Sequence, residues 1–361
     1  MSDTLRFRFL EQGGQAVADV AGELAAFLGQ ARHDVAIAIY DFRFEPTGGG
    51  QVVAETLQRL ARSGVHVRIC DHDDRVKKRE HQLPEVTPTP PPPPEYVDAL
   101  GLDVRPVTDF LGLMHDKFAV VDGTHVWTGS LNWTDDAFTL QENAICTIES
   151  REIAAEYTRV FEELWDGQKC EGTGDFEPAK TDLVLDGQRV VVRPFFCPGR
   201  GPEIAGRIAS AVRRARRRVL VCSPVLTSGP ILGALADVLD RPGLTVRGVV
   251  DGTQMRSVLR QWATDKTGAW KPAAYEAIAE RAGFSRKRSI PWAPGREHDY
   301  LHAKIMVCDD VAFLGSYNHS RSGEENAENV LVLEGAAAAD RLAAFVEVQI
   351  ERYRDDGKEE R

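Results

Sequence analysis

The chain of 361 residues lacks any long run of apolar residues. No segment approaches the roughly 18 consecutive apolar residues that a membrane-spanning helix needs. Residues 1–9 are polar and charged, unlike the apolar stretch of a secretory signal. These features predict a protein without a membrane segment, and we expect it in the cytoplasm.

Cysteine is scarce and has no metal-binding or redox spacing. Its six positions (70, 146, 170, 197, 222 and 308) form neither CxxC pairs nor Cys/His zinc sets. Several lie in apolar runs typical of buried strands, which predicts buried free thiols. The sequence also shows no carboxylate cluster that suggests a metal site. We therefore expect neither a metal nor another cofactor.

Acidic residues outnumber basic ones, 55 against 44, which gives a net charge of −11. Such a chain is unsuited to coating nucleic acid, since phosphate contacts need Lys and Arg, but an enzyme can still have a local basic cleft. Residues 253–300 hold nine Lys or Arg against five Asp or Glu, with three tryptophans. Cations interleaved with aromatic residues suit a groove for a single strand. A lid with packed tryptophans and solvated charges is the alternative for this segment.

Apolar periodicity alternates between strands and helices, which predicts an α/β fold. The order of elements repeats, because a strand, a helix and a second strand near the start have counterparts in the second half. The predicted elements at 5–9, 16–28 and 35–40 correspond to those at 189–195, 204–215 and 219–223. We expect two α/β/α sandwich domains with mixed sheets, related by a pseudo-two-fold axis.

The predicted domains are residues 1–167 and 186–361, joined by a linker at 168–185. The first domain has a proline-rich insertion at about 75–95, with five consecutive prolines at 90–94. The second has an insertion at about 253–300. An exposed, extended loop is the simplest interpretation of the proline-rich segment, and a docking motif is the alternative.

One motif occurs twice and organises both halves. Each copy reads His-x-Lys, four residues, Asp, and then Gly-Ser-x-Asn, and a Glu lies ten residues after that Asn. The first copy contains His115, Lys117, Asp122, Ser130, Asn132 and Glu142, and the second contains His302, Lys304, Asp309, Ser316, Asn318 and Glu328. Two complete copies with the same tail spacing make a chance match untenable.

The spacing places these polar groups together. His115 and Lys117 are two residues apart on a predicted strand, so both side chains point to one face. The pairs after the turn, Ser130 with Asn132 and Ser316 with Asn318, have the same spacing. Each half thus offers an imidazole, an ammonium, a hydroxyl and an amide. Cations and neutral donors around an imidazole suit a phosphate group.

The doubled motif resembles the signature of the phospholipase D superfamily, across both halves. The resemblance implies a phospholipase D-like fold and a covalent phosphohistidine, with one histidine attacking phosphorus and the other serving as acid and then base. It also implies that the lysines, serines and asparagines of the motif hold phosphate oxygens, and that Glu142 and Glu328 orient a histidine. Asp122 and Asp309 are expected to be structural. His115 matches the family histidine that is often the nucleophile, but the order stays open.

The substrate class is less well defined by the sequence. The motif tails at 129–137 and 315–323 resemble the small endonuclease branch, and the N-terminal membrane helices of the family's phospholipid synthases are absent. We therefore expect a metal-independent phosphodiesterase that cleaves nucleic acid, with a complete site possible in a monomer. The alternatives are a soluble phospholipase D acting on head groups, with prolines and tryptophans as an apolar rim, and a non-catalytic phosphate-binding scaffold.

Overall fold

The computed structural model describes residues 3–45, 48–72, 95–108, 112–263, 268–291, 293 and 296–354. The predicted proline-rich insertion lies almost wholly outside these ranges, as does Trp292.

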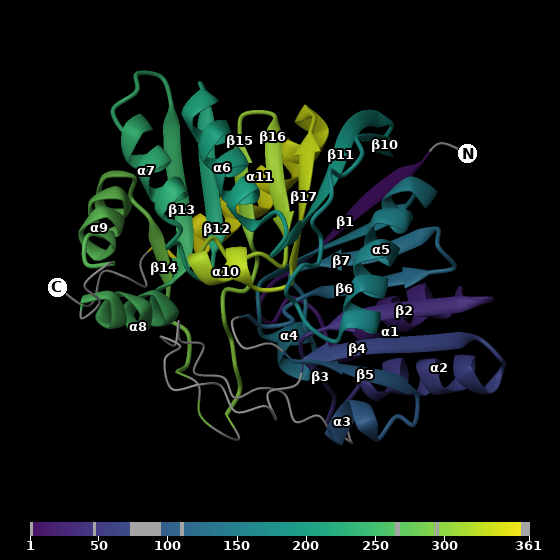
Figure 1. The fold of residues 1–361 in the computed structure, drawn as a ribbon. Coiled ribbons are helices and arrows are strands. Elements are labelled where there is room, and N and C mark those ends of the chain that lie inside the picture. The colour runs from purple at the N-terminus through teal and green to yellow at the C-terminus, as the bar shows by residue number, and fades with distance from the viewer. Residues whose placement is uncertain are drawn as a thin grey trace.

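A mixed sheet of 15 strands runs through both halves of the chain (Figure 1). The first half contributes β1 (Thr4–Leu10), β2 (Asp34–Ile39), β4 (His66–His72), β5 (Asp103–Val107), β6 (Lys117–Val121), β7 (His125–Gly129) and β9 (Asn143–Glu149). The second half contributes β11 (Gln188–Cys197), β12 (Arg218–Ser223), β13 (Thr245–Asp251), β14 (Ser285–Lys287), β15 (Ile305–Cys308), β16 (Val311–Gly315) and β17 (Glu328–Glu334). A separate two-stranded sheet pairs β3 (Phe42–Arg43) with β8 (Trp133–Thr134).

Strand pairing repeats between the halves, which confirms the predicted mixed α/β fold with two related parts. In the first half β2 lies between the parallel β4 and the antiparallel β6, and in the second β12 lies between the parallel β13 and the antiparallel β15. The strand β10 (Thr181–Leu185) pairs with β1 on one side and with β11 on the other. The segment 168–185, expected to be a linker, therefore ends in a strand that joins the two halves into one sheet.

Helices cover both faces of this sheet. The first half has α1 (Val17–Leu28), α2 (Gln51–Arg62), α3 (Glu95–Asp98), α4 (Asp135–Thr139) and α5 (Arg151–Gly167). The second half has α6 (Gly201–Arg214), α7 (Gly229–Val238), α8 (Gly252–Ala263), α9 (Lys271–Arg281), α10 (Arg321–Glu325) and α11 (Ala336–Arg352). The segment 253–300, expected to be an insertion, thus holds most of α8, all of α9 and the sheet strand β14.

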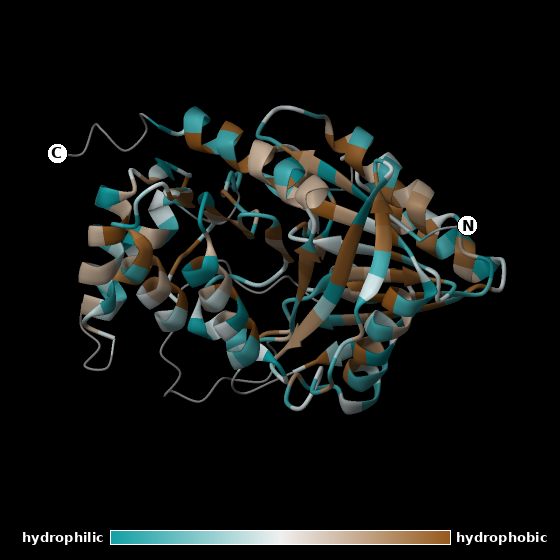
Figure 2. Cartoon of the chain, turned by 90° about the horizontal axis from the view of Figure 1, so that it is seen from above, coloured by the Kyte–Doolittle hydropathy of each residue, from teal (hydrophilic) through white to brown (hydrophobic). Residues whose placement is uncertain are grey.

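The two long helices, α5 and α11, build the core that the halves share. In α5 the buried residues Ile153, Tyr157 and Leu164 recur at helical spacing, and Ser150 caps the first turn by accepting the N–H of Ile153. Their side chains join one cluster with strands of both halves and with α11. In Figure 2 the helices alternate between hydrophobic and hydrophilic stretches, as expected of elements with one buried face.

All six cysteines are buried and none of them forms a disulfide, which confirms the prediction made from their surroundings. Within the described ranges, no helix combines the length and the apolar character that crossing a bilayer requires.

Candidate active site

A narrow cavity lies where the central parallel strands of both halves end. Tyr40, directly after β2, and Pro224, directly after β12, both line it. Ligands of open α/β sheets bind beyond the carboxyl ends of the strands, so the position is favourable. Four motif residues line the cavity: His115, Asn132, His302 and Asn318. Each half contributes one histidine and one asparagine.

Each motif histidine lies where a backbone segment of one half is hydrogen-bonded to a segment of the other. The N–H of His115 donates to the carbonyl of Ala327 at 2.9 Å, and the N–H of His302 donates to the carbonyl of Glu142 at 3.0 Å. Both histidines precede their strands, since β6 begins at Lys117 and β15 at Ile305. Backbone hydrogen bonds between the halves therefore fix the position of each motif histidine.

The two imidazoles have different partners. Nδ1 of His115 lies 2.8 Å from Oε1 of Glu328, whereas Nδ1 of His302 lies 3.2 Å from Oδ1 of Asn143. The amide of Asn143 is oriented by its own NH₂ group, which donates to the carbonyl of Ala137 at 3.2 Å. An acceptor at Nδ1 keeps the proton there and leaves Nε2 with its lone pair. Nε2 is therefore the nitrogen that a substrate can reach.

A one-residue offset explains the different partners. Glu142 and Glu328 occupy equivalent motif positions. His115 bonds to the carbonyl of Ala327, the residue before Glu328, but His302 bonds to the carbonyl of Glu142 itself. The next side chain along the chain then faces each ring, and for His302 this is Asn143. In the described structure the predicted contact of Glu142 with a histidine is therefore replaced by one from Asn143.

The carboxylate of Glu142 has other partners. Nζ of Lys287 donates to Oε2 at 2.7 Å, and the hydroxyl of Tyr353 donates to Oε1 at 2.5 Å. The N–H of Gln12 lies 3.3 Å from Oε1. Both Glu142 and Lys287 are buried. Sequence inspection missed Lys287, because it lies 145 residues from Glu142 and outside both motifs.

Each motif lysine bonds to the backbone of the histidine two residues before it. Nζ of Lys117 donates to the carbonyl of His115 at 2.6 Å, and Nζ of Lys304 donates to that of His302 at 2.7 Å. Burial lowers the pKa of Lys117 to about 8, although Glu328 opposes this, and burial lowers the pKa of Lys304 well below its usual value. Both amines are thus held away from water, and the negative charge of a bound phosphate would favour their protonated form.

Burial and the two lysines also act on the histidines. Burial, followed by the charges of Lys117 and Lys304, holds the pKa of His115 and of His302 well below the usual range. Both imidazoles are therefore neutral at pH 7. A bound phosphate brings negative charge close to the two lysines, which raises the pKa of the imidazoles and allows one of them to carry a proton.

The serines and asparagines of the motif separate into two groups. The hydroxyl of Ser130 donates to Oδ1 of Asn143 at 2.7 Å, and that of Ser316 accepts the N–H of Asn329 at 3.0 Å. The serines, predicted to bind phosphate, bond to residues at the starts of β9 and β17 and are not among the residues that line the cavity. Asn132 and Asn318 line the cavity, and within the described ranges the Oδ1 atom of each is buried without a hydrogen-bond partner. These two amides remain suited to a ligand.

Asp122 and Asp309 fix the turns after β6 and β15. The carboxylate of Asp122 accepts three backbone N–H groups at 2.8–2.9 Å, from residues 32–34. Asp309 accepts three at 2.8–3.0 Å, from residues 216–218. Both residues have left-handed backbone conformations, with φ of 49° and 53°. Each carboxylate therefore joins a turn to the start of the neighbouring strand, β2 or β12.

Several cavity residues lie outside the motifs. The ring of Tyr40 contacts that of His115 edge-on, with centroids 4.8 Å apart, and Nζ of Lys117 lies 5.0 Å from the Tyr40 centroid. Arg43 forms two hydrogen bonds with Asp41, at 2.7 and 2.9 Å, and both line the cavity. Tyr40 is the last residue of a predicted central strand and Asp41 follows it, and that position was the available signal.

Three histidines outside the motif also have defined places. His298 lines the cavity and alternates with Tyr300 and His302, which was a usable signal. His72 and His319 are not among the residues that line the cavity. Nδ1 of His72 instead accepts the N–H of Met114 at 3.3 Å, and His319 is buried beside Tyr317.

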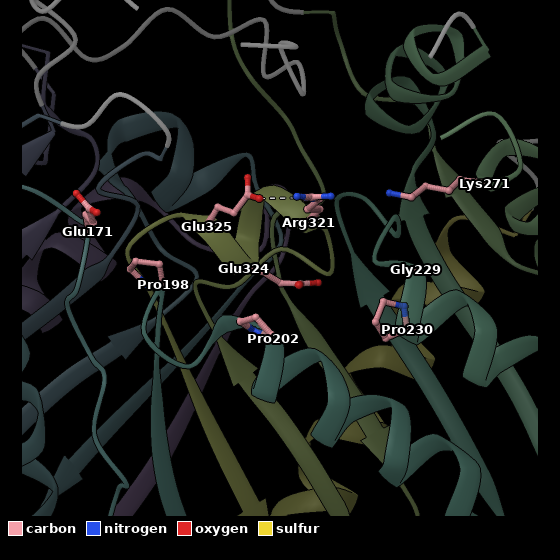
Figure 3. A pocket seen from close by; sticks show the side chains of 9 residues that line it. All are labelled: Glu171, Pro198, Pro202, Gly229, Pro230, Lys271, Arg321, Glu324 and Glu325. Atoms are coloured by element: carbon pink, nitrogen blue, oxygen red, sulfur yellow. Dashed lines mark hydrogen bonds and ion pairs between the residues drawn. The ribbon is translucent and has the colours of Figure 1, made fainter. Parts of the chain in front are cut away.

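A larger hollow of about 560 Å³ is lined by none of the motif residues. Figure 3 shows the side chains that border it. Prolines from the first turns of α6 and α7, together with Lys271 of α9, border it. Arg321 and Glu325 of α10 point toward each other there and form an ion pair at 3.0 Å. Its lining mixes both signs of charge, so its size alone does not make it the reaction site.

Comparison with known proteins follows the repeat. A family model described as cardiolipin synthase, PLD-like domain, matches twice, at residues 24–165 and 208–349. The mitochondrial cardiolipin hydrolase of Xenopus laevis is 46% identical over 69 residues, which are 19% of this chain and 32% of that protein. The virion nicking-joining enzyme of Monkeypox virus is 31% identical over 123 residues, which are 33% and 26%. The matched regions thus span about a third or less of these relatives.

Solved structures agree on the fold. Phosphatidylserine synthase from Haemophilus influenzae Rd KW20 superposes with a TM-score of 0.63 at 14% identity, covering 96% of this chain and 86% of that one. Polyphosphate kinase from Porphyromonas gingivalis gives a TM-score of 0.56 at 13% identity, covering 96% and 50%. The two family matches cover most of the chain, and each contains one complete His-x-Lys-x₄-Asp motif. The chain therefore belongs to the phospholipase D-like family.

Proposed function

We propose that the protein is a phosphodiester hydrolase that works through a covalent phosphohistidine, and that its substrate is a nucleic acid. The observation that carries this proposal is the pairing of His115 and His302 in one cavity. Each has its Nδ1 held by an acceptor from the other half, and a buried lysine lies beneath each. Such a site suits a nucleophile, an acid and a negatively charged phosphate between them.

The reaction has two displacements. Nε2 of His115 attacks phosphorus, a P–N bond forms, and the bond from phosphorus to the leaving oxygen breaks. His302, protonated once phosphate is bound, gives its proton to that oxygen. His302 then removes a proton from water, the resulting hydroxide attacks phosphorus, and the P–N bond breaks. No cofactor enters this sequence, because Lys117 and Lys304 supply the positive charge that the phosphate oxygens need.

The assignment of the two histidines rests on their partners. A phosphorylated imidazole is cationic, and the carboxylate of Glu328, 2.8 Å from His115, is placed to compensate that charge. The amide of Asn143 is neutral and stabilises a cationic His302 less. His302 is therefore the stronger acid, as proton donation to the leaving oxygen requires, and His115 is the nucleophile.

The exposed side chains support nucleic acid over phospholipid. Over the described ranges the exposed large apolar side chains are Val52, Tyr96, Trp270, Ile290 and Val348, and none of them lines the cavity. A phospholipase needs an apolar rim to dock on a membrane. Trp262 is buried, with Nζ of Lys271 4.0 Å from its ring centroid, while Trp270 is 51% exposed and available to stack on a base.

A phospholipase D acting on head groups is the second candidate. The description of the matching family model and the names of the cardiolipin hydrolases favour it. It requires that the polar cavity accept a glycerophosphate group. The two candidates share the chemistry at phosphorus and differ in the surface that delivers the substrate.

Hydrolysis of labelled single-stranded DNA and of cardiolipin vesicles, both in EDTA, tests the substrate. We expect cleavage of DNA alone. Release from vesicles alone would support the second candidate, and loss of all activity in EDTA would contradict the proposed mechanism.

Thymidine 5′-(p-nitrophenyl phosphate) tests the roles of the histidines, because nitrophenolate leaves without a proton. We expect His302→Asn to release about one nitrophenolate per molecule and to retain the nucleotide on His115 under alkaline denaturing conditions. His115→Asn should show no burst. A burst from His115→Asn instead would reverse the assignment, and the absence of turnover by the unmodified protein on every phosphodiester would overturn the proposed function.

A further inference from the structure

A buried ion pair lies behind His302 and, among the residues that the structure describes, has no counterpart behind His115. It joins Glu142, at the entry to β9, to Lys287, the last residue of β14. We propose that Lys287 is a positioning residue of the active site, which holds the carboxylate of Glu142 and thereby leaves His302 against the neutral amide of Asn143. This inference rests on the proposed function, since it concerns the acid of that reaction.

The contacts place the pair next to His302. The backbone carbonyl of Glu142 accepts the N–H of His302 at 3.0 Å. The carboxylate of Glu142 is therefore only the length of its own side chain away from this backbone contact with His302. Lys287, Tyr353 and the N–H of Gln12 donate to that carboxylate. Three donors, one of them cationic, satisfy a buried carboxylate. The carboxylate of Glu142 is therefore satisfied without a hydrogen bond from the imidazole of His302.

The repeat shows which residue makes the difference. His72 and Asp251 are equivalent, because each accepts the N–H of the residue before a motif histidine, Met114 at 3.3 Å and Leu301 at 3.1 Å. On the neighbouring outer strands, His72 is paired with Val107 and Asp251 with Lys287. The place that carries a cation in the second half thus carries a valine in the first.

The presence of valine in one half and lysine in the other favours different partners for the carboxylates of Glu328 and Glu142. Val107 is fully buried and offers no donor, so the carboxylate of Glu328 turns to Nδ1 of His115. Lys287 offers an ammonium, so the carboxylate of Glu142 turns to it. A buried charge without a partner is costly, and each carboxylate takes the strongest donor within reach. The exchange of valine for lysine therefore accompanies the one-residue offset, and together they give two unequal histidines.

Other charged groups also face His302 and must be held constant in any test. Lys304 of its own segment, Lys117 at the start of β6, and His115 act on its pKa. Asp251 at the end of β13 accepts the N–H of Leu301, the residue before it. Tyr300 and His298 line the same cavity. The Glu142–Lys287 pair is neutral as a unit, so removing one member changes the charge near His302 and removing both does not.

Titration of the His302 ring by NMR tests the inference directly, using full-length protein labelled with ¹³C-histidine and assigned with His302→Gln. Lys287→Met leaves the Glu142 carboxylate uncompensated, and we expect the affinity of His302 for a proton to rise about tenfold. Glu142→Gln leaves the ammonium uncompensated, and we expect a fall of about tenfold. The double variant should titrate like the unmodified protein. Arg286→Gln, one residue away on β14 and paired with Glu276, is the matched control.

The alkaline limb of kcat/KM on thymidine 5′-(p-nitrophenyl phosphate) and on a substrate with an alkyl leaving group gives a second measurement. It should shift to higher pH in Lys287→Met and to lower pH in Glu142→Gln, for the alkyl substrate only. Shifts in the same direction, or none, would reduce Lys287 to a structural residue. If Lys287→Met does not fold, the direction of the shift in Glu142→Gln decides. Absence of turnover in the unmodified protein would overturn the proposed function, while the NMR titration would still decide the role of Lys287.

Discussion

Nδ1 of His115 and Oε1 of Glu328 lie 2.8 Å apart, although 213 residues separate them in the chain. Burial raises the pKa of Glu328 to about 7, with Lys117 opposing the shift. The carboxylate that supports His115 is therefore formed only as the pH rises through about 7. The proposed nucleophile of one half therefore depends on the ionisation of a group in the other.

Glu328→Gln should remove this pH dependence. The unmodified protein should show an acid limb in kcat/KM with a midpoint near 7, because below it Glu328 is protonated and compensates no charge. In the glutamine variant we expect a roughly 100-fold lower kcat and no such limb. A pH–rate profile of both proteins measures this, and an unchanged acid limb in the variant would show that another group titrates there.

Asp309→Ala should destabilise the second half through the turn after β15. The variant leaves three backbone N–H groups without their acceptor, so we expect a loss of about 2 kcal/mol in the free energy of unfolding. Asp309→Asn keeps one acceptor oxygen and should cost less. Urea unfolding measures both. Asp186→Ala, which also has a left-handed backbone with φ of 50°, controls for the conformation alone.

Asp116→Asn should change how stability depends on pH. Oδ1 of Asp116 accepts a hydrogen bond from Asn329 at 2.7 Å, and burial raises its pKa from 3.8 to about 7. Between these values the folded protein keeps a proton that the unfolded chain has released, so this carboxyl contributes stability at low pH that is lost as the pH rises toward 7. Relative to the unmodified protein, the variant should therefore gain on the order of 2 kcal/mol between pH 5 and pH 8. Urea unfolding at both values tests this, and an equal difference at both would contradict it.

Trp270→Ala should weaken the binding of single-stranded DNA. Half of this side chain is exposed at the start of α9, and loss of a stacking platform costs about 1–3 kcal/mol per base. Fluorescence anisotropy with a labelled oligonucleotide measures the affinity, which should also fall steeply as salt rises because phosphate contacts release counterions. Tyr96→Ala, an exposed aromatic in the first half, is the control. Equal effects of both variants would argue against a defined groove at α9.

Much of the fold could be predicted from periodicity and from the repeat. The central strands and the long helices are apolar at regular spacing, and their predicted ranges agree with the structure to within a few residues. The strand β10 was missed because Thr181–Leu185 is short and follows a polar segment. The elements within 253–300 were missed because charges and tryptophans hide their periodicity, as in α9, where Lys271, Glu276 and Arg281 are dispersed along the helix.

The site could be predicted in its members but not in all of its contacts. A spacing of two residues shows that Ser130 and Asn132 are close, but not that the serine faces Asn143 while the asparagine faces the cavity. The partners of the histidines depend on how the two halves cross, and a shift of one residue there exchanges a glutamate for an asparagine. Such a shift leaves no mark in either motif, because it belongs to the register between segments far apart in sequence.

The strand β10 has a consequence for how the molecule behaves in solution. It occupies the inner edges of both β1 and β11, which would otherwise present unpaired N–H and C=O groups. The two half-sites are thus present in a fixed one-to-one ratio within a single chain. We therefore expect the specific activity to be independent of protein concentration, as it would be if one molecule supplied the whole reaction centre.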